Sequence, residues 1–186
     1  MAKTYCEFCN ALASDSIDPN KYYHDYEYGI ELFNDNEIFG RLVLEINQAG
    51  LSWTTILKKR DNFYKAFDQY DVACIASYGE DKYLELMSNS GIIRNKLKIN
   101  AVIYNANQIL LLQKEFGSFK AWLDSHRGIS LEAWVKLFKQ YFKFVGGEIV
   151  NEFLMSMGYL EGAHQETCEI YSKIQELKLK KNKISE

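Results

Sequence analysis

Proline and glycine are scarce in this sequence. Pro19 is the only proline among 186 residues, and the eleven glycines fall mostly at the ends of apolar segments. Folds rich in turns need more of both residues. Strand-like alternation of useful length is missing too, and so is any internal repeat. These absences favour helices and predict an all-α fold with short connections.

Long apolar runs are also missing. No run is long enough to span a bilayer, so a membrane is not expected as a partner. The first residues, Met1-Ala2-Lys3-Thr4-Tyr5-Cys6, contain no apolar signal segment. We therefore expect a cytoplasmic protein, in which the four cysteines are free thiols or metal ligands rather than disulfides.

Hydrophobic residues are plentiful, at 47% of the chain with 15% aromatics, which is enough for a substantial core. The length suggests one domain, or a core domain with an appended lobe. A net charge of -3 speaks weakly against nucleic acid, but the placement of charge matters more than the sum. Acids concentrate at residues 15–37, whereas cations gather at residues 58–60, 94–98 and 136–143 and in a Lys-rich tail, residues 176–186.

Apolar side chains at helical spacing predict core helices over about residues 31–158. A stripe from Asp35 should end at Gly50, and Ser52 can cap the next helix. Four further residues can begin helices, namely Asp71, Asp81, Ser118 and Ser130. Residues 1–30 are expected to be irregular, because Asp18 and Pro19, among others, break any periodicity.

Cysteine and histidine occur in two half-sites that are distant in sequence. His164 and Cys168 are four residues apart, so on a helix they would share one face. Cys6, Cys9 and His24 lie near the N-terminus. Two cysteines and two histidines would complete a closed tetrahedral zinc site, and spacing leaves the choice between Cys6 and Cys9 open. The alternative is a scatter of unrelated thiols and imidazoles.

Residues 90–96, Ser-Gly-Ile-Ile-Arg-Asn-Lys, form a predicted turn between two helices. Backbone N–H groups at the start of the second helix, beside Lys96 and Lys98, could bind one phosphate. The alternative is a tight helix connection with a solvated basic face.

Glu45 lies within the apolar sequence Leu44-Glu45-Ile46, followed by Gly50, Leu51 and Trp53. A carboxylate among apolar neighbours is costly unless it is paired or used. It could hold a flat, electron-poor ring against Trp53. The alternative is an acid at a helix end, exposed to water or paired with Lys58 or Arg60.

Four segments together resemble the DNA-3-methyladenine glycosylase I family of the helix-hairpin-helix superfamily. They are residues 23–29 (Y-H-D-Y-E-Y-G), 44–60 (beginning L-E-I-N-Q-A-G-L-S-W), 91–98 (beginning G-I-I-R) and 142–146 (F-K-F-V-G). The resemblance covers about Cys6 to Cys168. It implies a single helix-hairpin-helix glycosylase unit with a zinc-stapled lobe, formed from about residues 1–30 and 159–175.

The resemblance also assigns residues. It implies structural zinc bound by Cys6, His24, His164 and Cys168, with Cys9 as an alternative to Cys6. It implies a base pocket in which Glu45 is catalytic and contacts the base, together with Trp53, Tyr23, Phe8 and Tyr28. It implies DNA contacts by Gly50, Leu51, Gly91, Ile93, Arg94 and Lys96.

The implied reaction is hydrolysis of the N-glycosidic bond of 3-methyladenine in duplex DNA by a monomeric enzyme that flips the base into this pocket. No Asp can be placed in the sugar-stabilising role, and the family is thought to lack one. Three departures are evident: Tyr28 replaces Trp, Asn47 replaces Gln, and residues 124–139 are shortened. The alternatives are a weak or inactive zinc-stapled DNA-binding protein, or a glycosylase for another alkylated base.

Overall fold

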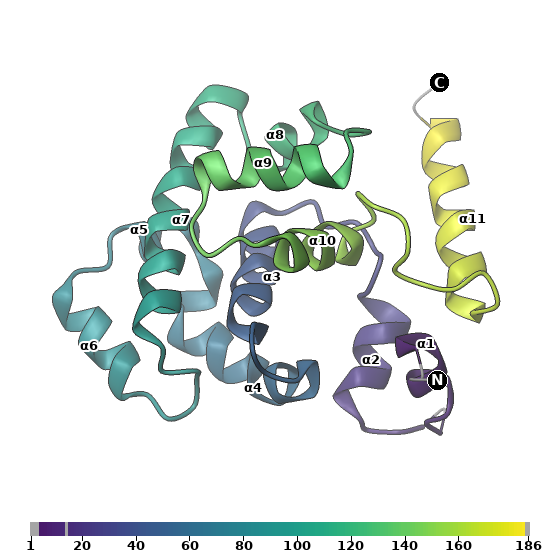
Figure 1. Cartoon of the computed structure of the whole chain (residues 1–186), viewed down its shortest axis with the longest axis horizontal. Coiled ribbons are helices and arrows are strands. Elements are labelled where there is room, and N and C mark those ends of the chain that lie inside the picture. The colour runs from purple at the N-terminus through teal and green to yellow at the C-terminus, as the bar shows by residue number, and fades with distance from the viewer. Residues whose placement is uncertain (1–3, 14, 185–186) are drawn as a thin grey trace. The chain divides into compact units, whose positions relative to one another are not determined.

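The computed structural model describes residues 4–13 and 15–184, with side chains up to residue 177. All regular structure in this part of the chain is helical, so the predicted all-α class is confirmed (Figure 1). Among these residues, no helix could cross a membrane. Residues 1–3 and residues 185–186 of the predicted tail lie outside the described part. The helices are α1 Tyr5–Asn10, α2 Pro19–Tyr26, α3 Asp35–Gln48, α4 Trp53–Ala66, η1 Asp68–Tyr70, α5 Val72–Ala76, α6 Glu80–Ser88, α7 Lys96–Phe116, α8 Phe119–Ser125, α9 Leu131–Tyr141, α10 Gly147–Ser156 and α11 Glu169–Ile184.

The chain divides into two compact units. One unit is residues 32–153, which contain α3 to α9 and most of α10. The other combines the described residues up to Glu31 with those from Leu154 onward, and it contains α1, α2 and α11.

Helix α7 is the long central helix of the unit formed by residues 32–153, and it packs against α3, α5 and α8 (Figure 1). Asn95 begins it, because its side-chain oxygen accepts hydrogen bonds from the N–H groups of Leu97 and Lys98. Gly117, with φ of 87°, ends it in the left-handed conformation that glycine favours. The buried side of α7 includes Val102, Ala106 and Ile109.

An aromatic cluster fills the core beside α8 and α9. Trp122 is fully buried, and its ring centroid lies 5.8 Å from that of Phe119, 5.6 Å from Phe138 and 5.7 Å from Phe142. Asp35, at the start of α3, accepts hydrogen bonds from the backbone N–H groups of Phe119 and Lys120 at 2.8 and 3.0 Å. This carboxylate therefore ties the start of α3 to the positive end of α8.

Four predicted caps are confirmed, since Ser52, Asp71, Ser118 and Ser130 each accept a backbone hydrogen bond at a helix start. The prediction for Asp81 was wrong, because α6 begins at Glu80 after Gly79 and holds Asp81 in its first turn.

The expectation of an irregular segment over residues 1–30 was also wrong. Thr4 begins α1 through a reciprocal pair of hydrogen bonds with Glu7. Asp18 caps α2, and Pro19 occupies its first position. Both residues were predicted to interrupt a helix. A proline at the first helical position, however, lacks only an N–H that would have no partner within the helix.

Candidate active site and metal site

Glu45 lies in the last turns of α3 and is buried, with 4% of its surface exposed. Burial raises the pKa of its carboxyl to about 8; the nearby Arg41 opposes the shift, and Glu152 adds to it. Arg41 lies one turn earlier on the same helix and is buried too. A water-exposed acid is therefore excluded, and the charges that act on Glu45 are those of Arg41 and Glu152 rather than Lys58 or Arg60.

The turn between α3 and α4 follows within five residues. Gly50 is exposed, with φ of 81°, and a Cβ added to it would meet no atom within 4 Å. Leu51 is 39% exposed, which is unusual for a leucine beside a core helix. Its N–H donates to the carbonyl oxygen of Gln48 at 2.7 Å, which closes the turn. Trp53 then begins α4 and is half-buried. The same unit thus holds a buried carboxyl, an exposed turn and an aromatic ring close together in sequence.

Asn47 turns back onto its own helix. Its side-chain amide donates to the carbonyl oxygen of Val43 at 2.8 Å, and only 1% of the residue is exposed. This bond holds the side chain of Asn47 within α3.

Two exposed cations lie where the segment between α6 and α7 ends: Arg94 within the segment and Lys96 at the first position of α7. The expectation that Lys98 also lies outward was wrong, because it is 4% exposed and points to the end of α3. The N–H groups of Leu97 and Lys98 are bound by Asn95, so they are not open to a phosphate. Of the groups predicted to contact phosphate here, Arg94 and Lys96 are the ones that are exposed.

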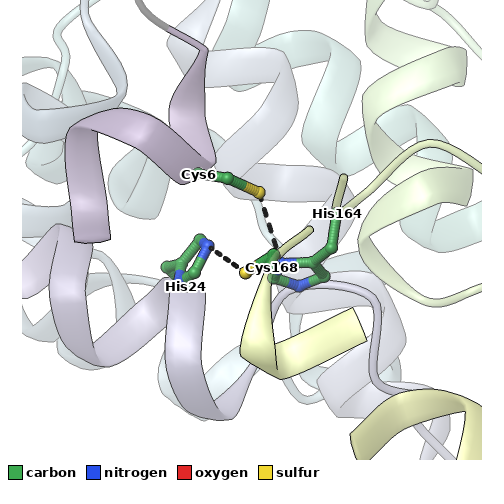
Figure 2. A group of neighbouring side chains, drawn as sticks. All are labelled: Cys6, His24, His164 and Cys168. Atoms are coloured by element: carbon green, nitrogen blue, oxygen red, sulfur yellow. Dashed lines mark hydrogen bonds between the residues drawn. The ribbon is translucent and has the colours of Figure 1, made fainter. Parts of the chain in front are cut away.

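In the unit formed by the two chain ends, four side chains converge from three segments: Cys6 from α1, His24 from α2, and His164 and Cys168 from the segment before α11 (Figure 2). Their ligand atoms all lie within 4.8 Å of one another, and all four residues are buried. The Cys6 sulfur is 3.7 Å from His164 Nδ1, and the Cys168 sulfur is 3.7 Å from His24 Nε2. Two thiols and two imidazoles at this spacing fit the four corners of a tetrahedral metal site.

Hydrogen bonds on the far sides of the rings orient both histidines. His164 Nε2 lies 2.8 Å from the carbonyl oxygen of Tyr28, so this nitrogen carries the proton and Nδ1 faces the cluster as an acceptor. His24 Nδ1 lies 2.7 Å from a carboxylate oxygen of Asp25, which leaves Nε2 free for a metal. Lys21 holds Asp25 in turn, at 2.7 Å. Asp25 was not predicted to support the site, although its place next to His24 was a usable signal in the sequence.

Cys9 faces away from this cluster. Its sulfur lies 3.6 Å from the carbonyl oxygen of Asn20, and it is fully buried. Of the two cysteines left open by spacing, Cys6 is the one beside the histidines. His164 and Cys168 do not share a helix, because α11 begins only at Glu169. A turn, in which Cys168 N–H donates to the carbonyl oxygen of Gln165 at 2.8 Å, brings the two ligands together instead.

The aromatic residues predicted for the base pocket in this unit differ in exposure. Phe8 is 41% exposed on α1, whereas Tyr23 and Tyr28 are buried. The rings of Tyr23 and Tyr28 lie 5.5 Å apart, and Tyr28 also contacts the ring of His164 at 5.5 Å. Tyr28 therefore packs between the Cys/His cluster and Tyr23.

A known protein family shares most of this sequence. The family described as methyladenine glycosylase matches residues 15–140. The chain belongs to this family. The enzyme class predicted from the sequence, a DNA-3-methyladenine glycosylase that hydrolyses N-glycosyl bonds, is thereby confirmed.

Two relatives align with most of this glycosylase. It is 33% identical over 165 residues to the DNA-3-methyladenine glycosylase of Haemophilus influenzae, a match that covers 78% of this chain and 89% of the relative. It is also 33% identical over 168 residues to DNA-3-methyladenine glycosylase 1 of Escherichia coli, covering 80% and 89%.

Solved structures show the same fold. The glycosylase resembles the 3-methyladenine DNA glycosylase I of Staphylococcus aureus with a TM-score of 0.77 and 28% identity, over 87% of this chain and 96% of that one. A tyrosine-to-phenylalanine variant of 3-methyladenine DNA glycosylase I in complex with 3-methyladenine gives a TM-score of 0.77 and 28% identity, over 85% and 94% of the two chains.

Proposed function

We propose that this glycosylase removes 3-methyladenine from duplex DNA by hydrolysing the N-glycosidic bond, after flipping the damaged nucleotide out of the helix. The observation that carries the proposal is the buried carboxyl of Glu45, one turn from an exposed loop, in a chain of this family. An acid that the fold keeps from water is expensive to maintain unless a ligand uses it.

The chemistry of the substrate explains why one carboxyl is enough. Adenine methylated at N3 is cationic while it is attached to the sugar, so it is already a good leaving group. The enzyme therefore needs to extrude the base, hold it and reject ordinary adenine. A buried carboxyl can select the methylated base over ordinary adenine. A cationic base stabilises the ionised carboxylate, whereas a neutral base does not offset the free-energy cost of burying that charge.

In this proposal the aromatic residues hold the base. Trp53 supplies a π-face on the α4 side, and Tyr23 and Phe8 supply further aromatic surface, as the family resemblance implies. The exposure of Phe8 makes it available for stacking. Tyr28 contributes through Tyr23, whose ring it contacts.

The two exposed turns of the unit formed by residues 32–153 are proposed to contact DNA. Gly50 and Leu51 would press into the space left by the flipped nucleotide, for which an exposed apolar side chain and a glycine with open space are suited. Residues 89–95 between α6 and α7 would form the hairpin, with Gly91 and Ile93 at the backbone of the DNA. Arg94 and Lys96 would neutralise phosphate.

The metal in this proposal is zinc with a structural role. Four protein ligands, Cys6, His24, His164 and Cys168, leave no position for water or substrate. Bound zinc would favour the thiolate form of Cys6, which burial, together with the neighbouring Cys168, otherwise disfavours by raising the pKa of this thiol. The metal would thus join the two ends of the chain within one unit.

The test is release of free 3-methyladenine from methylated duplex DNA by the wild type and by Glu45→Gln. We expect release by the wild type and a loss on the order of 100-fold or more in the variant, because the amide cannot supply the negative charge. Glu115→Gln, an exposed acid on α7, is the matched control and should keep wild-type activity.

Two results would contradict the proposal. If zinc-loaded wild type released no 3-methyladenine but still bound duplex DNA, the chain would be a DNA-binding protein without this activity. If it released a different alkylated base instead, the substrate would be wrong while the reaction class would stand.

A further inference from the structure

Lys98 occupies a position in which a lysine is costly. It lies at the start of α7 with 4% of its surface exposed, and its desolvation lowers the pKa of the ammonium group. Its Nζ donates to two backbone oxygens, that of Asn47 at 2.8 Å and that of Ala49 at 2.7 Å. The mechanism proposed above does not use this group.

The two oxygens belong to the end of α3. A helix leaves its last carbonyl groups without partners inside the helix, and they carry its partial negative charge. Ala49 leaves the helical conformation, with φ of -50° and ψ of 117°. The ammonium of Lys98 therefore satisfies acceptors directly before Gly50 and Leu51, which has the effect of a helix cap supplied by another element.

Lys98 is itself held on two further sides. Its backbone N–H donates to the side chain of Asn95 at 3.2 Å, which fixes it at the start of α7. The ring of Phe144 lies 5.7 Å from Nζ. Buried Asn105 anchors the residue before Phe144, accepting from Lys143 N–H at 2.8 Å and donating to its carbonyl at 3.1 Å.

A second lysine makes the reciprocal connection. Lys59 on α4 donates from Nζ to the carbonyl oxygens of Ser90 and Gly91, each at 3.2 Å. Lys98 thus connects the start of α7 with the turn before α4, and Lys59 connects α4 with the turn before α7. Four hydrogen bonds therefore connect the region around the α3–α4 turn with the region around the α6–α7 turn. All four are donated by charged ammonium groups, which form the stronger class of hydrogen bond.

We propose that Lys98 is a positioning residue, which holds the α3–α4 turn (residues 49–52) in the orientation that lets Gly50 and Leu51 enter the duplex. The inference rests on the proposed function, since it assigns these two residues to DNA. Lys98 touches neither the base nor the sugar. It acts through the carbonyl groups that define where the turn begins, at a distance of two residues from Leu51.

The test uses the full-length, zinc-loaded protein and three variants. Lys98→Met keeps length and apolar volume but removes the donors, Lys98→Arg restores donors, and Lys114→Met changes an exposed lysine on the same helix. For Lys98→Met we expect kcat/KM on methylated duplex DNA to fall about 100-fold, mostly through KM, because a displacement of about 1 Å in a positioning group can have this effect. Binding of free 3-methyladenine should stay within about threefold of wild type, since Glu45 and Trp53 are unchanged.

A readout that does not depend on DNA accompanies the kinetics. The amide of Leu51, which donates to Gln48, should exchange with solvent at least about tenfold faster in Lys98→Met, while amides in the middle of α3 keep their protection. Lys98→Arg should recover part of both losses, and Lys114→Met should show neither.

The inference is overturned if Lys98→Met retains wild-type kcat/KM with unchanged Leu51 exchange. It is also overturned if exchange accelerates along the whole of α3, because Lys98 would then support the helix in general. A wild-type protein that released no base would overturn the proposed function instead, and the Leu51 exchange rate would still decide whether Lys98 fixes the turn.

Discussion

Glu45 is a single residue whose ionisation the fold opposes. In the unfolded chain it ionises near its ordinary pKa of 4.5, whereas in the folded protein burial holds its pKa at about 8. Between these values the folded state binds more protons than the unfolded state. The free energy of unfolding contributed by this group therefore falls as the pH rises from 4.5 to 8, and it stays low above pH 8.

Glu45→Gln should remove this pH dependence. We expect the variant to be more stable than wild type by at least about 1 kcal/mol at pH 8, with a much smaller difference at pH 4.5, because the amide carries no charge to bury. Denaturant unfolding at the two pH values measures this, with Glu115→Gln as the control. Parallel pH profiles for Glu45→Gln and wild type would refute the burial argument.

The same residue scale shows what a sequence can and cannot predict. The apolar neighbours of Glu45 made a buried acid one of two predictions, the other being an acid exposed or paired at the helix end, because a helical position between core residues has few ways to reach water. The neighbours of Lys98 in the sequence did not predict its burial. A lysine at the start of a helix has the same local sequence whether it faces a phosphate or the end of another helix, and the difference depends on where α3 ends in space.

At the scale of elements, α3 is shaped by its contact with the turn that follows α4. Asp68, Gln69 and Tyr70 have φ values of 44°, 59° and 60°, a left-handed run that non-glycine residues rarely adopt. This run places Tyr70 against Gly40 in the middle of α3. A Cβ on Gly40 would lie 2.8 Å from Cε2 and 2.9 Å from Cγ of the tyrosine ring.

Gly40→Ala should therefore destabilise the protein, although alanine is the better helix former. The clash should outweigh the gain in helix propensity of about 1 kcal/mol and leave a net loss of about 2 kcal/mol. Thermal or denaturant unfolding measures the change. Gly147→Ala in α10 is the control, because its Cβ would meet only Val135 at 3.9 Å and should cost less than about 0.5 kcal/mol. An unchanged or raised stability for Gly40→Ala would contradict the packing.

The start of a helix could be predicted from the sequence where a single capping residue determines it. Ser52, Ser118 and Ser130 were predictable because a hydroxyl before an apolar stripe has few other uses. The helices α1 and α2 were missed because they are short, with six and eight residues, and neither has a long apolar stripe. Such helices depend on packing within their unit more than on their own propensity.

At the scale of the whole molecule, residues from both ends of the chain form one unit, and periodicity alone does not predict this. The pairing of Cys6 and His24 with His164 and Cys168 was predictable as chemistry, since two half-sites make one closed site. Spacing alone could not predict that Cys6 and not Cys9 completes the cluster, because this depends on how α1 packs against α2. In the structure Cys6 faces the histidines, while Cys9 faces Asn20.

Metal removal should consequently loosen one unit and spare the other. We expect a chelator to speed hydrogen exchange in α1, in α2 and in residues 159–168, because the protons or free thiols left behind do not replace the lost bonds. Amides in the core of α3 and α7 should keep their protection, since these helices pack against other helices of residues 32–153.

Metal analysis should find about one zinc per chain in the wild type and in Cys9→Ala, and a large loss in Cys6→Ala and Cys168→Ala. Equal zinc in all four proteins would remove the metal from this cluster, and uniform acceleration of exchange throughout the chain would show that its effect is not confined to one unit.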